Sequence, residues 1–484
     1  GINAEYGGSQ LMSNKKQKKQ EKNQEKVQEA PTKSSLVNPT IMQISTRQWL
    51  YELGIKNIKD VPDTVLDQFK KDGITVVYLV GVWKLGQFGL NHNKLDDELV
   101  KQFKQTLPDL QTADIIGSPF VITEYSVNPQ IGSDEDIKQF KARLHERGML
   151  LLLDFVPNHC AVDSPLVGDH PEYFIQHPFV DGHQQLSTGF YYSRENEQVL
   201  TDRLCYNLAS VEAQTARIAE MQLVATFCDG IKVIDPSQTS VESWNKTWAQ
   251  LSELKEDFWP KAIAEIKKSQ PEFKFFVESV DMSLKQKGFD FVYDTELLSK
   301  TLLNGDAKQI ESFLKEDKIM EAHVQNTSSN EKKNLVAAMA LTLPGIRIHF
   351  LGGKSKEDFC LRRTHQKKEA GKEVSQLQEK IAKLLNDSVW KEGKFQVEKV
   401  EGAENWRLLA WTWQAGEKRA LVVVNISDQQ ETRQGAIRLD IGDEVSVKFA
   451  DQLSGQIYER EGKDVKEFGL CCVLEKMKMQ IFYY

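Results

Sequence analysis

Hydrophobic and polar positions from about Ile41 onward alternate between short apolar runs and longer amphipathic stretches. The short runs are apolar on both faces for most of their length, which is typical of strands buried on both sides in a parallel sheet. The predicted strands are ITVVYLV (74–80), MLLLLDF (149–155), TFCDGIKVID (226–235), FKFFVES (273–279), FDFVYD (289–294), IMEAHVQN (319–326) and IRIHFLG (346–352).

Amphipathic stretches between these runs are long enough for crossover helices. Two of them are DEDIKQFKARLHERG (134–148) and FWPKAIAEIKKSQ (258–270). Strand and helix alternate in this way over roughly 300 residues, which predicts an α/β fold, either doubly wound or closed into a barrel. No Gly-x-Gly-x-x-Gly follows a predicted strand, so the pattern gives little support for dinucleotide binding.

The pattern changes after the helical stretch EVSQLQEKIAKLLN (373–386). Short strand-like runs follow, separated by turn signals such as QAGEK and SDQQ, which predicts an antiparallel β-sandwich. These runs are WRLLAWTWQ, RALVVVNIS, AIRLDI, VSVKFA and CCVLEKMKMQIFYY. We therefore predict an α/β domain over residues 41–390 and a β domain over residues 395–484.

Charge and composition narrow the classes of partner. The net charge of −8 argues against a nucleic-acid or anionic-membrane partner, since either favours a basic surface. No window holds the roughly 18 consecutive apolar residues that a membrane span needs, so we predict a cytoplasmic protein. The six cysteines are scattered without the close Cys/His spacing of a zinc site, and we predict reduced thiols and no bound metal of that kind.

The N-terminal segment differs from the rest of the chain. Residues 1–11 match the translation of a common cDNA-synthesis adapter, and we interpret them as derived from cloning, with Met12 as the start. Residues 12–40 are rich in Lys, Gln and Glu and cannot bury enough apolar surface to fold alone. We predict a disordered, charged tail.

Polar side chains stand at the ends of four predicted strands, namely Asp154, Asp235, Glu278 and Asn326. One such residue alone is more often a turn or capping residue. Barrel enzymes place their chemistry where strands end, so four polar strand ends predict a functional site at that face. Trp83 near the second strand could stack on a sugar ring, but we expect it to pack beneath the loops.

The segment LLLDFVPNHCAVDSP (151–165) resembles the Asp-x-x-x-Asn-His motif of the α-amylase superfamily of retaining glycoside hydrolases, with Asp154, Asn158 and His159 in the matching places. The flanking GSPFVITEYSVNPQIG, HPEYFI, LTLPGIRIHFLGG and MQISTRQWL are also similar to that family. The resemblance covers residues 41–484. It implies a (β/α)8 TIM barrel, a small excursion at about 160–210 after the third strand, and a C-terminal antiparallel β-sandwich domain.

The family's chemistry implies a nucleophilic Asp on the fourth strand, a Glu acid on the fifth and a third carboxylate, an Asp, on the seventh. The fourth-strand pattern ends here in Ile234, an aliphatic side chain that cannot attack, and Lys232 stands for the family's Arg. Glu278 retains the position of the acid. On the seventh strand one register places Asn326 on the Asp, and the other places Val324 there.

Asp235 follows the substituted nucleophile position by one residue. Side chains alternate along a strand, so Asp235 should face away from Lys232 and Ile234 unless the backbone bends at Pro236. We prefer a strand-end residue bonded to nearby backbone, and Asp235 as a shifted nucleophile remains the alternative.

Two functions follow from the resemblance. We predict a pseudoenzyme with impaired or absent catalysis that binds an α-glucan or small saccharide, or that serves as a scaffold for a protein partner, as in the amylase-like heavy chains of heteromeric amino-acid transporters. The alternative is an active α-glucan hydrolase or transglycosylase of carbohydrate metabolism that uses Asp235 and Glu278. The resemblance implies saccharide-binding roles for Asp154, Asn158, His159, Lys232 and Gln325. It implies no required cofactor, although Asn158 and His159 could instead support calcium.

Overall fold

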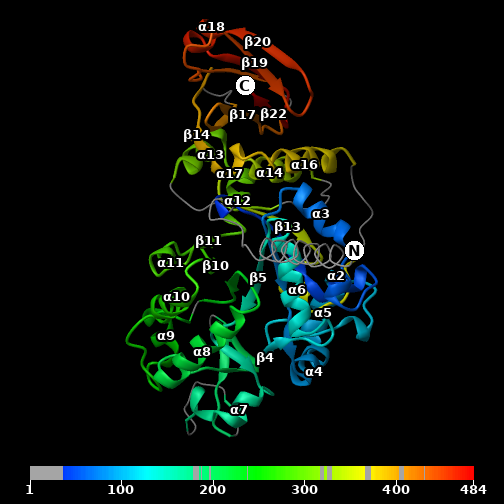
Figure 1. Ribbon diagram of the computed structural model, residues 1–484, viewed down its shortest axis with the longest axis vertical. Helices are drawn as coiled ribbons and strands as arrows, with labels where there is room; N and C mark the ends of the chain where they lie inside the picture. Colours follow the sequence, from blue (N-terminus) through cyan, green and yellow to red (C-terminus); the bar gives the residue numbers. More distant parts are fainter. Residues whose placement is uncertain are drawn as a thin grey trace, which may run out of the picture.

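A barrel and a C-terminal β domain make up the computed structural model, with the β domain at the top of Figure 1. The structure describes residues 36–177, 185–186, 188–195, 198–236, 238–316, 321–323, 330–365, 372–402, 408–429 and 431–484. Of the N-terminal tail predicted over residues 12–40, residues 12–35 lie outside the described residues.

Eight parallel strands form the barrel sheet, and the last strand pairs with the first. All seven predicted runs contribute a strand, and MQISTRQWL supplies the opening one, which confirms the predicted (β/α)8 fold. Within the part of the chain that the structure describes, no pairing joins β11 to β12. The strands are β1 (Thr40–Ser45), β2 (Val76–Val80), β5 (Leu150–Phe155), β9 (Gly230–Val233), β10 (Lys274–Glu278), β11 (Phe291–Tyr293), β12 (Glu321–His323) and β13 (Ile346–Leu351).

Amphipathic helices cross over between the strands. In α6 (Asp134–His145), Ser133 and Asp136 form a capping box in which each side chain accepts the other residue's backbone N–H. The apolar residues of α6 fall on one face and are buried against the barrel. The other helices are α2 (Thr46–Glu52), α3 (Asp63–Lys71), α4 (Gln87–Leu95), α5 (Asp97–Thr106), α7 (Pro165–Asp169), α8 (Val211–Val224), α9 (Val241–Trp248), α10 (Phe258–Ser269), α11 (Ser283–Gln286), α12 (Leu297–Asn304), α13 (Ala307–Lys315), α14 (Glu331–Leu341), α15 (Lys356–Phe359), α16 (Lys372–Leu384), α17 (Val389–Glu392) and α18 (Gly462–Glu467).

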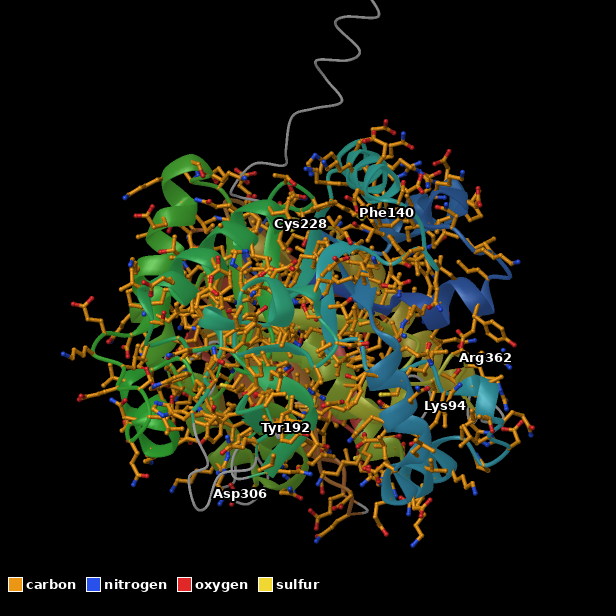
Figure 2. The ribbon with its side chains drawn as sticks, turned by 90° about the horizontal axis from the view of Figure 1, so that it is seen from below. Lys94, Phe140, Tyr192, Cys228, Asp306 and Arg362 are labelled. Atoms are coloured by element: carbon orange, nitrogen blue, oxygen red, sulfur yellow. The ribbon has the colours of Figure 1, made fainter. Side chains whose placement is uncertain are left out.

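Two excursions leave the barrel. After β5, a three-stranded antiparallel sheet is built from β6 (His159–Ala161), β8 (Gln198–Cys205) and β7 (Tyr192–Glu195), and this sheet confirms the excursion predicted there. After β2, a smaller sheet pairs β3 (Trp83–Leu85) with β4 (Ile122–Val127). In Figure 2, Tyr192 of β7 and Lys94 of α4 lie toward one side of the molecule, opposite Cys228 and Phe140.

Trp83 belongs to the barrel core. Its side chain is fully buried, and its ring meets Tyr125 and Phe227 edge-on at 5.3 and 5.4 Å between centroids. Its indole N–H donates to the backbone oxygen of Asp154. The expectation that Trp83 packs beneath the loops is confirmed.

The C-terminal domain is a sandwich of two antiparallel sheets, as predicted. One sheet has the order β14 (Lys394–Val397), β16 (Leu409–Ala415), β17 (Lys418–Asn425), β22 (Lys478–Tyr483), β19 (Ser446–Asp451) and β20 (Ile457–Glu461). The other has the order β15 (Val400–Glu401), β18 (Arg433–Ile437) and β21 (Leu470–Leu474).

Successive side chains of β16 point to opposite faces of the larger sheet, and both faces are buried. Trp411 and Trp413 pack on the barrel's helices, and both indole N–H groups donate to Thr342 just after α14. Ala410 points the other way, into the core between the two sheets. Figure 1 accordingly shows α13, α14, α16 and α17 between the barrel strands and the β domain.

Candidate active site

A cavity of about 860 Å³ opens at the carboxyl ends of the barrel strands. Its walls come from the ends of β9, β10 and β11, from β8 of the excursion, and from the segment that follows β13. Five of the predicted site residues line it, namely His159, Lys232, Ile234, Asp235 and Glu278. The structure therefore brings these five together where barrel enzymes hold their substrates.

The chain leaves strand β9 earlier than the apolar run suggested. β9 ends at Val233, and Asp235 adopts a left-handed backbone conformation with φ of 52°. The side-chain amide of Asn158 donates to the Asp235 carbonyl at 2.6 Å and holds this turn. Because the strand has already ended, the alternation of side chains does not extend to Asp235, which lines the same cavity as Ile234.

Glu278 is held between two partners at the end of β10. Its Oε2 atom lies 3.1 Å from the Lys232 ammonium, and its Oε1 atom accepts a hydrogen bond from Thr295 at 2.6 Å. The Lys232 ammonium also lies over the rings of Tyr78 and Tyr293. Burial lowers the pKa of Lys232, but interactions with Tyr293 and Glu278 outweigh it and raise the pKa above its usual value. Lys232 is therefore a permanent cation beside Glu278.

Asp154 lies beneath the cavity rather than in its wall. The side chain is fully buried, one oxygen accepts the Gly81 N–H at 2.7 Å, and the other accepts the Tyr78 hydroxyl. Burial raises the pKa of the Asp154 carboxyl to about 6, although these hydrogen bonds oppose the shift. Asp154 therefore ties β5 to β2 and to the turn that follows β2.

His159 contacts two other residues of the excursion. Its Nδ1 atom lies 3.3 Å from the Ser193 hydroxyl and its Nε2 atom 3.4 Å from the Arg203 guanidinium. Burial and the charge of Arg203 hold the pKa of His159 well below its usual value, which keeps the ring neutral.

Calcium takes six to eight oxygen ligands. Asn158 donates its amide N–H₂ to the Asp235 carbonyl, and its Oδ1 atom is buried without a hydrogen-bond partner among the described residues. Support of calcium by Asn158 and His159 therefore stays a prediction. Across the ranges that the structure describes, no three His, Cys, Asp or Glu side chains gather in a way that could hold a metal ion.

Gln325 and Asn326, the predicted seventh-strand residues, lie outside the described residues, as does Val324 of the other register. Both registers remain predictions. Their neighbour His323 ends β12.

Sequence reasoning missed two side chains that shape the site. Thr295 bonds Glu278, and Arg203 lies beside His159 at the cavity wall. Thr295 could have been found, because Asp294 and Thr295 follow the run FDFVYD as the other polar residues follow their strands. Arg203 carries no such signal, since it comes from the excursion and reaches the site only through pairing of β8 with β6.

Comparison with known proteins agrees with this fold. Residues 118–203 match the family model described as "Alpha amylase, catalytic domain". A noncanonic maltogenic α-amylase from Thermotoga neapolitana superposes with a TM-score of 0.66 at 18% identity, covering 93% of this chain and 99% of that one. An α-amylase from Lactobacillus plantarum superposes with a TM-score of 0.65 at 17% identity, covering 93% and 100%.

The fold is that of the α-amylases. Among curated proteins, the α-1,4-glucan:maltose-1-phosphate maltosyltransferase of Picrophilus torridus is 23% identical over 282 residues, which is 54% of this chain and 39% of that protein. The enzyme of the same name from Bifidobacterium animalis is 23% identical over 256 residues, covering 52% of this chain and 30% of its own length. The chain thus spans about a third of the length of the curated relatives it matches.

Proposed function

We propose that this chain is an α-amylase-like pseudoenzyme that binds a neutral saccharide in the barrel-mouth cavity without hydrolysing it. The observation that carries the proposal is the ion pair between Lys232 and Glu278 beside Ile234. A retaining glycosidase needs a carboxylate nucleophile and a protonated acid about 5 Å apart. Ile234 supplies no nucleophile at the end of β9.

The same ion pair opposes the acid's role. A general acid must carry a proton when the leaving group departs, and active glycosidases keep one by raising the carboxyl pKa. An ammonium 3.1 Å away favours the ionised form of a carboxylate instead. Lys232, which resembles the Arg that pairs with the nucleophile in active relatives, here binds the remaining carboxylate.

The ligand class follows from the cavity and from the relatives. The residues lining the cavity include eight carboxylates and four Lys or Arg side chains, so an anionic ligand is disfavoured. The matched curated enzymes are named for transfer to an α-1,4-glucan, and we infer that a malto-oligosaccharide is the ligand. The role as a scaffold for a protein partner stays a prediction, because no contact among the described residues bears on it.

The first test is turnover. We expect purified protein to release no product from maltoheptaose or from an aryl α-glucoside above the level of a Glu278→Gln variant. The Gln keeps the shape of the side chain but can neither donate nor accept a proton as a carboxyl does, so it measures the background.

Hydrolysis above that background would overturn the proposal and favour the second candidate, in which Asp235 is the nucleophile. That candidate draws on one observation, namely that the turn at Asp235 places it in the wall of the cavity that Glu278 also lines. A covalent fluoroglycoside adduct on Asp235, detected by mass spectrometry, would establish it.

The second test is binding. We expect calorimetry to detect maltoheptaose, and we expect Ser279→Trp to weaken binding at least tenfold, because Ser279 lines the cavity next to Glu278. Ser283→Trp adds the same ring at an exposed position outside the cavity and should bind as the natural chain does. Equal binding by both variants would place the saccharide elsewhere.

A further inference from the structure

A second pocket, of about 230 Å³, lies beside α2 and shares no lining residue with the barrel-mouth cavity. Its walls come from α2 and the segment after it, from the loops around Ile116 and Ile131, and from Arg362 beyond α15. The volume equals roughly eight water molecules at ~30 Å³ each, which suits a small organic molecule.

The charge of this pocket is opposite to that of the barrel mouth. Arg47, Lys56 and Arg362 line it, and no carboxylate does. The side chains of Leu50, Ile55, Ile116 and Ile131 supply the rest of the wall together with Tyr51 and Gln130. Cations above an apolar wall favour a ligand that carries both an anionic and an apolar part.

Arg47 is a cation without an acidic partner. Its Nη1 atom donates to the Ile116 carbonyl at 2.6 Å, and its Nη2 atom donates to the Gly117 and Phe359 carbonyls at 2.7 and 3.1 Å. In the ranges that the structure describes, no carboxylate pairs with its guanidinium. Burial lowers the pKa of Arg47 to about 10, which is the cost of holding this charge away from water. An anion in the pocket would offset that cost.

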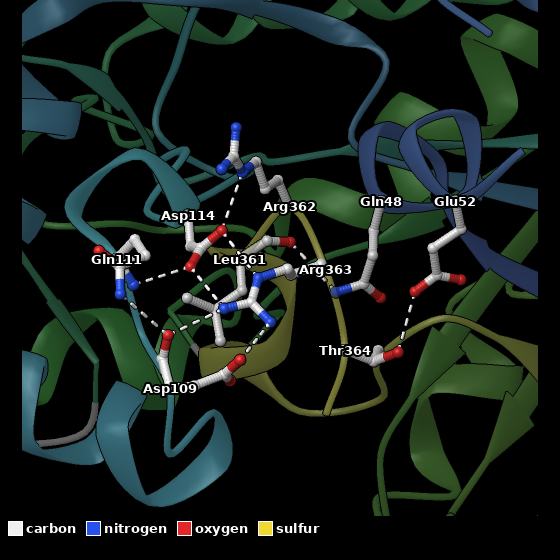
Figure 3. A network of polar contacts seen from close by, with 9 residues as sticks. All are labelled: Gln48, Glu52, Asp109, Gln111, Asp114, Leu361, Arg362, Arg363 and Thr364. Carbon is white, nitrogen blue, oxygen red and sulfur yellow. Dashed lines mark hydrogen bonds and ion pairs between the residues drawn. The ribbon is translucent and has the colours of Figure 1, made fainter. Parts of the chain in front are cut away.

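Arg362 presents its free end in the same place. Its Nε atom donates to Asp114 at 2.9 Å, while Arg363 binds both Asp114 and Asp109. Figure 3 shows the Arg362 guanidinium at the edge of this network, with its terminal nitrogens on the side away from Arg363. The guanidinium also lies 5.0 Å from the ring centre of Tyr51.

Lys56 completes the set of cations. It is exposed, and it forms no ion pair with any residue that the structure describes. Three cations thus face the pocket, of which only Arg362 has a carboxylate neighbour.

We propose that this pocket binds a small organic carboxylate with a compact apolar or aromatic body. The carboxylate lies among Arg47, Lys56 and Arg362, where the planar end of the Arg362 guanidinium suits its two oxygens and the other two cations add charge. The apolar body packs on Leu50 and Ile131, whose side chains are buried in the barrel wall. The site is separate from the proposed saccharide site, so neither proposal depends on the other.

Benzoate is a suitable probe, with benzamide as its neutral analogue. We expect benzoate to bind the full chain with a Kd on the order of 1 mM, which is typical of so small a ligand, and to bind at least tenfold more tightly than benzamide in ligand-observed NMR. Lys56→Glu should weaken benzoate binding at least fivefold. Lys59→Glu makes the same charge change at an exposed position three residues away that does not line the pocket, and it should leave binding unchanged.

A third variant tests the shape of the pocket without changing its charge. Ile55→Trp keeps every charge but fills the pocket, and it should abolish binding while the thermal unfolding midpoint confirms that the chain is folded. Benzamide binding as tightly as benzoate, the two lysine variants behaving alike, or no saturation up to about 10 mM benzoate would each overturn the proposal.

Discussion

The ends of the neighbouring strands β5 and β9 are built in opposite ways, although Asp154 and Lys232 stand side by side in the register between them. At the end of β5, Asp154 is buried, and both carboxylate oxygens have hydrogen-bond donors within the barrel. At the end of β9, Ile234 is aliphatic and Lys232 turns to Glu278 on the next strand.

This difference indicates that some residues of the α-amylase-like motifs stabilise the fold, whereas others stand where the chemistry would occur. The residues that match the α-amylase pattern are the ones that hold loops in place, since Asp154 fixes the turn after β2 and Asn158 fixes the turn at Asp235. In the function we propose, Ile234 takes the place of a catalytic nucleophile, so that the barrel keeps its architecture while the end of one strand changes its chemistry.

The largest expected effect comes from the end of β5. Replacing Asp154 with Ala removes the acceptor of the Gly81 N–H and of the Tyr78 hydroxyl, and both donors are then buried without a partner. Each buried donor without a partner costs about 1–3 kcal/mol of stability. Part of this cost is offset, because the variant no longer buries a carboxylate. We expect the free energy of unfolding to fall by about 2–4 kcal/mol, measured by urea denaturation.

Asp154→Asn is the matched control for this measurement. The amide oxygen still accepts one hydrogen bond, and the side chain keeps its volume, so the loss should be less than half that of Asp154→Ala. If Asp154→Ala left the free energy of unfolding unchanged, the ends of β5 and β9 would not differ in their contribution to stability.

The sequence predicted most of this architecture, because a parallel barrel leaves a strong local signal. Runs such as MLLLLDF are apolar on both faces only if both faces are buried, and all six residues of β5 are buried. The run WRLLAWTWQ likewise predicted a strand of a β domain, but not that Trp411 and Trp413 would bond Thr342 of the barrel. That contact joins residues about 70 positions apart, and no local pattern encodes it.

The site was harder to predict than the fold. Glu278 and Lys232 were found from the family pattern, but their ion pair depends on the relative height of β9 and β10, which hydrophobic periodicity does not report. Asp235 was judged by strand alternation, and that rule requires a strand that continues. The left-handed turn at Asp235 ends it first, with the help of Asn158 from 77 residues earlier in the chain.

The smallest expected effect comes from the end of β9. Replacing Lys232 with Met keeps an unbranched apolar stem among Tyr78 and Tyr293 but removes the ammonium that pairs with Glu278. The Glu278 side chain is 39% exposed, so water can solvate the carboxylate once the ammonium is gone, and the variant no longer buries a charge. We expect the free energy of unfolding to change by less than about 1 kcal/mol in the same urea experiment. Lys232→Arg, which retains the charge, should lie within that range as well. If Lys232→Met lowered the free energy of unfolding as much as Asp154→Ala does, the ion pair would stabilise the barrel mouth. The end of β9 would then contribute to stability as the end of β5 does.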